Sequence, residues 1–170
     1  MSQSTTTYIV AAVLFHDIVN LAKNHPERRE ASARSAEKAR AWFGARGFEP
    51  HRIALIAEAI LCHSWSAGHV PVSLEARVVA DADNLESVGA FGIARTFYVS
   101  GHMGSAIVNM ADPLGTAREL DDRAFARDHF PRKLLKLRDQ MRTEGGRVLS
   151  AQRHDFMVAF LAQLDAELGL

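Results

Sequence analysis

Helix-forming residues run through almost the whole chain, and this pattern most limits the folds open to it. Val and Ile occur mainly within stretches that also contain Ala, Leu, Glu and Arg, which favour helices. Few segments alternate apolar and polar residues in the manner of a half-buried strand. We therefore predict an all-α fold, a single domain over residues 1–170 with six or seven helices and no substantial sheet.

Apolar spacing and helix-breaking residues predict where these helices lie. Pro50 stands at the expected start of the third helix, and Ser73 is placed to cap the fourth. The expected inner stripe of the second helix consists of Ala36, Ala39 and Phe43. The first helix is apolar on nearly all sides, as is typical of a buried helix. Residues 100–123 read as a long ordered loop, a type of segment that often carries function. The predicted helices cover residues 8–22, 27–45, 50–63, 74–88, 90–99, 124–141 and 143–168.

The composition excludes several classes of protein. With 170 residues, 48% hydrophobic and 24% charged, the chain suits one compact domain and is not disordered throughout. Cys62 is the single cysteine, which rules out an intramolecular disulfide and disfavours a thiolate metal cluster. Twenty basic residues balance twenty acidic ones, so no overall field steers the chain toward a nucleic-acid polymer. Without a leader or a long apolar run, we expect a cytoplasmic protein with no membrane partner.

A His–Asp pair, His16-Asp17, follows the apolar run of the first predicted helix. Neighbouring side chains on a helix point about 100° apart, so both could reach one metal ion. Burying a carboxylate among apolar residues is costly unless it is paired or binds a cation. The alternative is that Asp17 ends a helix at the surface and His16 is a hydrogen-bonded core histidine. The dipeptide alone favours this alternative, because so short a motif often occurs by chance.

Two further predicted helices carry ionisable residues. His63 ends the third helix, where an isolated histidine more often interacts with the helix dipole than with a metal. Asp81 and Asp83 lie on opposite sides of the fourth helix, each beside apolar residues, so we expect at least one in the interior. The pattern does not choose between them. Together with the pair, these residues form a nitrogen–oxygen set that suits Mn, Mg, Fe, Ni, Co or Zn.

These residues belong to a longer series of stretches that occur in a fixed order along the chain. They are LFHDIVN at 14–20, KNHPER at 23–28, AILCHS at 59–64, SLEA at 73–76, DADNLESVGAFGIAR at 81–95, LDD at 120–122, DHF at 128–130, KLLKL at 133–137 and MRTEGGR at 141–147. The series resembles the HD-domain metal-dependent phosphohydrolases, in particular a bacterial branch of small single-domain members. With this resemblance, the metal interpretation of His16-Asp17 becomes the favoured one.

The resemblance implies a divalent cation held by a first His, the His–Asp pair and a later Asp. Carried over, the ligands are His16, Asp17 and Asp83, which sits in an Ala-Asp-x-Leu context, with Asp81 as the reserve. His63 is similar to a family histidine beside the metal, and is assigned with Asp17 to the catalytic or substrate-contacting groups. Cations that could bind the phosphate, although each could equally be a surface charge, are Lys23, Arg28, Arg95 and Lys133.

One part of the family pattern is not matched. No histidine precedes His16, so the family's first helix is expected to be missing before residue 8. The alternatives are a truncated start and the loss of this ligand, for which His25, His51, His102 or His129 could substitute. The implied function is a metal-dependent phosphohydrolase that cleaves a phosphate ester or anhydride of a small substrate, with a nucleotide favoured, using metal-activated water. The alternatives are an HD-fold binding or regulatory protein with an incomplete metal site, and a helical protein whose first helix pairs with another subunit as a homo-oligomer.

Overall fold

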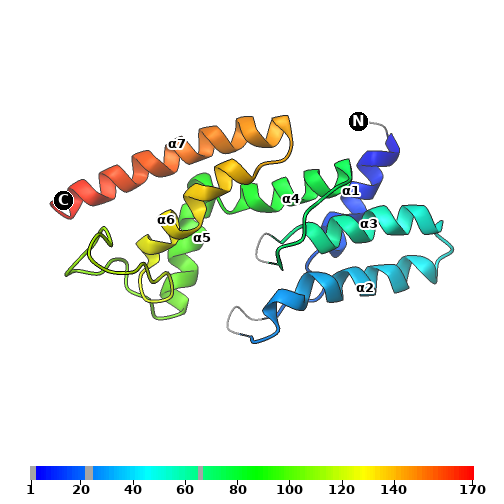
Figure 1. Cartoon of the computed structure of the whole chain (residues 1–170), viewed down its shortest axis with the longest axis horizontal. Helices are drawn as coiled ribbons and strands as arrows, with labels where there is room; N and C mark the ends of the chain where they lie inside the picture. Colours follow the sequence, from blue (N-terminus) through cyan, green and yellow to red (C-terminus); the bar gives the residue numbers. More distant parts are fainter. Residues whose placement is uncertain (1–2, 22–24, 65–66) are drawn as a thin grey trace. The chain divides into compact units, whose positions relative to one another are not determined.

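Helices account for most of the described chain, which comprises residues 3–21, 25–64 and 67–170 of a computed structural model (Figure 1). No strand occurs within these ranges, where one isolated bridge joins Ala106 and Phe125. This confirms the predicted all-α fold. No helix in these ranges is both long and apolar enough to cross a membrane. The α-helices are α1 (Gln3–Phe15), α2 (Ala31–Gly44), α3 (Pro50–Cys62), α4 (Leu74–Glu86), α5 (Gly89–His102), α6 (His129–Arg132) and α7 (Glu144–Glu167), and the short 3-10 helices are η1 (Arg28–Glu30), η3 (Ala126–Asp128) and η4 (Leu134–Gln140).

Two compact units make up the chain, and their boundary falls within α4, between Asp83 and Asn84. The first unit contains α1, α2, α3 and most of α4, and the second contains α5, α6 and α7. The predicted organisation as a single domain stays a prediction.

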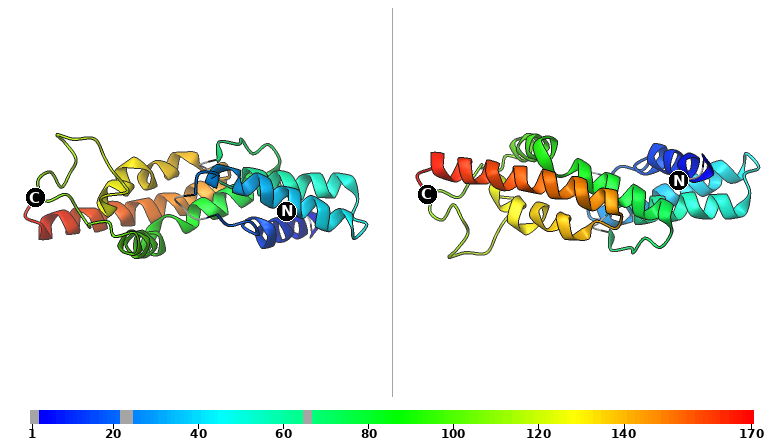
Figure 2. Two further views of the ribbon diagram at one scale, coloured as in Figure 1. Left: turned by 90° about the horizontal axis from the view of Figure 1, so that it is seen from below. Right: turned by 90° about the horizontal axis from the view of Figure 1, so that it is seen from above.

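The core of the first unit is formed where α1 and α2 pack against α3, as Figures 1 and 2 show. The predicted inner stripe of α2 is confirmed, because Ala36, Ala39 and Phe43 are all buried. Phe15 ends α1 with its ring 5.1 Å from those of both Trp42 and Phe43. This aromatic contact fixes the end of α1 on α2, directly before His16.

The first helix differs from its prediction at both ends, since it covers residues 3–15 and not 8–22. At its start, the Thr7 hydroxyl donates to the Gln3 carbonyl at 3.0 Å. Beyond Phe15, the Val19 N–H donates to the Ser35 hydroxyl at 3.1 Å. Because a side chain of α2 satisfies this backbone donor, the chain can leave the helix without an unpaired amide.

The expectation that the first helix is buried on all sides is wrong. Val10 is 52% exposed and Leu14 is 74% exposed, whereas Ala12 is fully buried. The helix therefore contacts the described chain along one face only, through residues that include Tyr8, Ile9 and Phe15.

Several other predicted helix boundaries are confirmed, and one predicted helix is not found. Helix α3 begins at Pro50, and the Ser73 hydroxyl accepts a hydrogen bond from the Ala76 N–H at 3.1 Å as an N-cap of α4. The continuous helix predicted over residues 124–141 is instead the three short helices η3, α6 and η4. Pro131 has no N–H with which to continue a helix from residue 127, and Lys133 leaves helical backbone at φ −134°.

The second unit has its own core and its own ordered loop. The loop joins α5 to η3 and is fastened by side chains: the Asp112 carboxylate accepts from the backbone N–H groups of Thr116 and Ala117 at 3.0 and 2.8 Å. This confirms an ordered excursion close to the predicted range, although α5 extends to His102. The core residues are Val88, Ile93, Phe130, Leu134, Leu137, Met141, Met157 and Leu161.

Candidate metal centre

Two histidines occupy equivalent positions, each as the first residue after a helix. His16 follows α1 and His63 follows α3, so the predicted placement of His16 within the last turns of a helix is wrong. Each ring nitrogen Nδ1 lies 2.6 Å from the backbone carbonyl oxygen three residues earlier, which belongs to Val13 and Ile60 respectively. The last carbonyls of a helix have no partner within the helix, so they are free to accept these bonds.

These carbonyl contacts determine which ring nitrogen carries the proton. A carbonyl oxygen can only accept a hydrogen bond, so Nδ1 must be the donor in both rings. In a neutral imidazole the remaining nitrogen, Nε2, then has a lone pair and can bind a cation. A hydrogen bond from the other nitrogen is the arrangement that orients metal-binding histidines in proteins. The backbone of α1 and α3 therefore prepares both rings as ligands.

The Asp17 carboxylate lies between these two nitrogens. One of its oxygens is 3.8 Å from His16 Nε2 and the other is 3.7 Å from His63 Nε2. The two rings meet edge to face with their centroids 4.9 Å apart. Both oxygen–nitrogen distances exceed hydrogen-bond length. Two lone pairs and a carboxylate thus converge, and such a set of acceptors is stabilised by a cation between them.

The pKa values of Asp17 and His63 are shifted in opposite directions, and both shifts reflect the attraction between this carboxylate and positive charge beside it. The polar contact with His63 holds the pKa of the Asp17 carboxyl below its ordinary value, helped by the charges of His16 and Arg28 and opposed by partial burial. Burial tends to lower the pKa of His63, which is only 5% exposed. The contact with Asp17, the bond to the Ile60 carbonyl and the charge of Asp83 outweigh burial, so the pKa of His63 is raised.

A divalent cation fits this donor set. His16, Asp17 and His63 each offer one ligand atom, and these atoms lie within 4.8 Å of one another. Two atoms bound to one cation at 2.0–2.2 Å are about 3–4 Å apart, which agrees with the separations of 3.8 and 3.7 Å between the Asp17 oxygens and the two histidine nitrogens. Two imidazoles and a carboxylate suit Zn, Mn, Fe, Co or Ni better than Ca, which prefers oxygen ligands. The structure therefore brings His63 into the candidate ligand set itself, and not only beside it.

The two aspartates of α4 differ in environment. Asp81 is buried, at 2% exposure, whereas Asp83 is half-buried. Neither belongs to the group of ligand atoms within 4.8 Å, but the Asp83 charge acts on His63. The expectation that at least one aspartate is interior is confirmed, and it is the reserve candidate that is interior.

The predicted phosphate-binding cations are placed differently from one another. Lys23 lies outside the described residues. Arg28 is committed to the segment that follows Asp17, since its Nη1 donates to the Asn20 side chain at 2.8 Å and to the Leu21 carbonyl at 2.5 Å. Arg95 and Lys133 belong to the second unit, where Arg95 faces Glu86 at 3.9 Å and Lys133 is half-buried.

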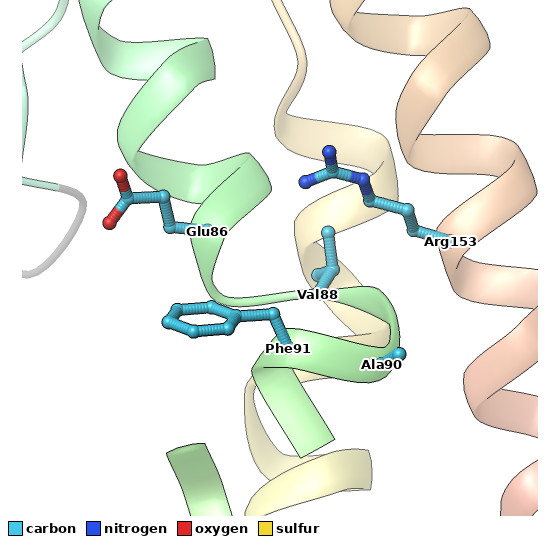
Figure 3. A pocket seen from close by; sticks show the side chains of 5 residues that line it. All are labelled: Glu86, Val88, Ala90, Phe91 and Arg153. Atoms are coloured by element: carbon cyan, nitrogen blue, oxygen red, sulfur yellow. The ribbon is translucent and has the colours of Figure 1, made fainter. Parts of the chain in front are cut away.

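A hollow of about 570 Å³ in the second unit lies beside Glu86 (Figure 3). Phe91 and Val88 line it, and Arg153 of α7 extends toward the end of α4, where its guanidinium donates to the Leu85 carbonyl. Gly89 is required here, because its φ is +77° and an added Cβ would lie 2.9 Å from the Arg153 side chain. Arg153 thus caps the end of α4, and the described residues that line the hollow include no histidine and no carboxylate pair.

None of the other histidines proposed as substitute ligands joins the cluster. His25, His51 and His102 are exposed, and His129 lies 2.8 Å from the Asp122 carboxylate in the second unit. Within the described ranges, the group of possible ligands contains His16, Asp17 and His63 alone. The sequence-based assignment placed His63 beside the metal, whereas the structure brings it into the candidate ligand group; like His16 it follows an apolar helix, and this shared context was the available signal.

The part of the chain that contains the cluster is similar to a known protein family. A profile of the family described as HD domain matches residues 5–88, which contain the whole cluster. The chain is 38% identical to the uncharacterized protein YpgQ of Bacillus subtilis over 98 residues, 58% of this chain and 42% of YpgQ. The alignment thus spans less than half of that relative.

Solved structures extend the similarity to nearly the whole fold. The crystal structure of Bacillus subtilis YpgQ in complex with ADP matches with a TM-score of 0.67 and 29% identity, over 94% of this chain and 73% of that chain. An HD-superfamily hydrolase from Bacillus thuringiensis matches with a TM-score of 0.70 and 28% identity, over 95% and 73%. A Lactobacillus plantarum protein matches with a TM-score of 0.67 and 30% identity, over 94% and 75%.

Proposed function

Because the chain belongs to the HD-domain family, we propose that it is a metal-dependent phosphohydrolase that uses metal-activated water. The observation that carries this proposal is the convergence of His16, Asp17 and His63, whose facing atoms are all acceptors when the rings are neutral. Hydrolase chemistry is the activity attributed to the Bacillus thuringiensis relative. A bound divalent cation would polarise a phosphoryl oxygen and lower the pKa of water.

The residues of the chain divide this work between them. His16 and His63 hold the cation through Nε2, and the carbonyls of Val13 and Ile60 keep both rings turned toward it. Asp17 supplies the anionic oxygen. Asp83 is proposed as a further oxygen ligand, a role supported by the action of its charge on His63. Asp17 would also orient the attacking water through the oxygen that does not bind the cation, whereas both ring nitrogens of His63 are already used, one by the cation and one by the Ile60 carbonyl.

A nucleotide is the proposed substrate class. The support comes from YpgQ, whose crystal structure was determined in complex with ADP. Three of the four predicted phosphate-binding cations, Lys23, Arg95 and Lys133, stay candidates from the sequence alone. Arg28 is given a different role, because its donors are directed to Asn20 and Leu21.

A nucleotide-binding or regulatory protein without turnover is the second candidate. It is favoured by the size of the ligand cluster, which offers three protein groups within the described residues. Both functions predict metal binding, so only product formation separates them.

The direct test is phosphate or pyrophosphate release from a panel of nucleoside mono-, di- and triphosphates, with Mn²⁺, Mg²⁺, Co²⁺ or Ni²⁺ supplied. Wild-type protein should release product only with metal, and D17N and H16A should lose at least a hundredfold in rate. H51A is the matched control, since His51 is an exposed histidine at the start of α3 and should be dispensable.

Metal binding without product from any nucleotide would favour the regulatory function. Equal rates in D17N and wild type would contradict the proposed site itself.

A further inference from the structure

The segment after Asp17 is the least supported side of the cluster. His63 follows α3, whose residues Ile56 and Ile60 are almost fully buried against α2. Asp17 instead lies on a turn, with its side chain 44% exposed. The separation between the Asp17 carboxylate and His63 therefore depends on what holds this turn to the α2–α3 pair.

Three hydrogen bonds fasten the segment to the start of α2. The Val19 N–H donates to the hydroxyl of Ser35, a fully buried residue of α2. One nitrogen of Arg28 donates to both the Asn20 side chain and the Leu21 carbonyl. Arg28 belongs to η1, which leads directly into α2. All three anchors therefore connect the turn to the helix that packs on α3.

The short helix that carries Arg28 is itself braced. Arg34, one turn into α2, places one nitrogen 2.8 Å from carboxylate oxygens of both Glu27 and Glu30. These glutamates flank Arg28 in the sequence, so the brace limits the movement of its backbone. Arg28 is also near enough for its charge to act on Asp17.

We infer that Arg28 and Ser35 are positioning residues, which hold the Asp17 turn against α2 so that the carboxylate faces both histidines. This inference rests on the proposed metal site, but assigns Arg28 a role other than phosphate binding. Residues that orient metal ligands typically contribute 10–100-fold to metal affinity. A lysine would keep the charge but not the planar geometry and reach of the guanidinium, so it should replace these two bonds only in part.

Cobalt titration followed by visible absorption tests the inference, because the spectrum reports the ligand geometry. R28Q should weaken Co²⁺ binding about tenfold or more and alter the spectrum. R28K, which keeps the charge, should recover part of the affinity, and S35A should weaken binding less. R29Q is the matched control, since Arg29 is the exposed neighbour within η1. Wild-type affinity and spectrum in R28Q would overturn the inference.

Amide hydrogen exchange in metal-free protein gives a separate measurement. R28Q and S35A should speed amide exchange over residues 18–21, whereas R29Q should exchange at the wild-type rate. The global unfolding midpoint should be the same in all three variants as in wild type. If wild type binds no Co²⁺, the proposed function fails, and exchange alone decides the positioning role: unchanged exchange in R28Q overturns it. Should R28Q fail to fold, R28K and S35A carry the same comparison.

Discussion

Asp128 and Asp17 show two different uses of the same functional group. Asp128, in the second unit, has a fully buried side chain that accepts hydrogen bonds from two Arg118 nitrogens at 2.5 and 2.9 Å and from the Asp121 N–H at 2.8 Å. Asp17, in the first unit, is 44% exposed, and its oxygens are 3.7 and 3.8 Å from imidazole nitrogens. The chain satisfies the first carboxylate completely and leaves the second facing other acceptors. A buried and satisfied carboxylate stabilises the fold, whereas an exposed carboxylate that faces two imidazole nitrogens is available to bind a cation.

Stability should separate the two carboxylates most strongly. D128N should lower the free energy of unfolding by about 3 kcal/mol, because it leaves Arg118 without its charged partner. D17N should change the stability of the metal-free protein by less than about 1 kcal/mol, as expected for an exposed group. Urea unfolding measures both, and D139N, at an exposed position of η4, is the control. Equal losses in D128N and D17N would make Asp17 a structural residue.

Metal should stabilise one of the two variants and not the other. At a free Mn²⁺ concentration a hundredfold above Kd, wild type should gain about 2.7 kcal/mol in the free energy of unfolding. D128N should keep this gain from its lower starting point, and D17N should lose it. Thermal unfolding with and without Mn²⁺ provides the measurement. A gain of the same size in D17N would place the metal elsewhere.

Opposite pH dependences should distinguish the two sites in the metal-free protein. Burial raises the pKa of Asp128, but the Arg118 fork and the Asp121 N–H hold it below its ordinary value. Its contribution is therefore complete above about pH 3.9 and lost as the pH falls toward the lowered pKa. The pKa of His63 is raised, so its contribution is complete below about pH 6.5 and lost as the pH rises through the raised value.

Unfolding free energies across pH, compared with those of D128N and H63Q, check these signs. The difference between wild type and D128N should shrink in acid, and that between wild type and H63Q should shrink above neutrality. A constant difference for H63Q across this range would show that His63 gains no proton-linked stabilisation from Asp17.

Local chemistry explains which parts of the fold were predictable from the sequence. Pro50 and Ser73 act on their own helix ends, and the small residues of α2 define its buried stripe, so these features were confirmed. The end of α1 was not predictable, because it depends on Ser35 and Arg28, which lie in later segments.

The helix predicted over residues 124–141 failed for a related reason. Arg127 pairs with Asp165 of α7 at 2.7 and 2.8 Å, and Asp128 pairs with Arg118. These partners are distant in sequence, and no periodicity within the segment reports them. The site shows the same division: the His–Asp pair is visible in the sequence, whereas the approach of His63 depends on how α1 and α3 pack.

The metal content of the purified protein tests the central claim most directly. Wild-type protein, stripped with a chelator and dialysed against increasing Mn²⁺ or Co²⁺, should bind metal saturably at the cluster of His16, Asp17 and His63. D17N, H16A and H63Q should each lose this binding, and H51A and D128N should retain it. Absence of saturable binding in wild type, or wild-type binding in D17N, would contradict the assignment of this cluster as a metal centre.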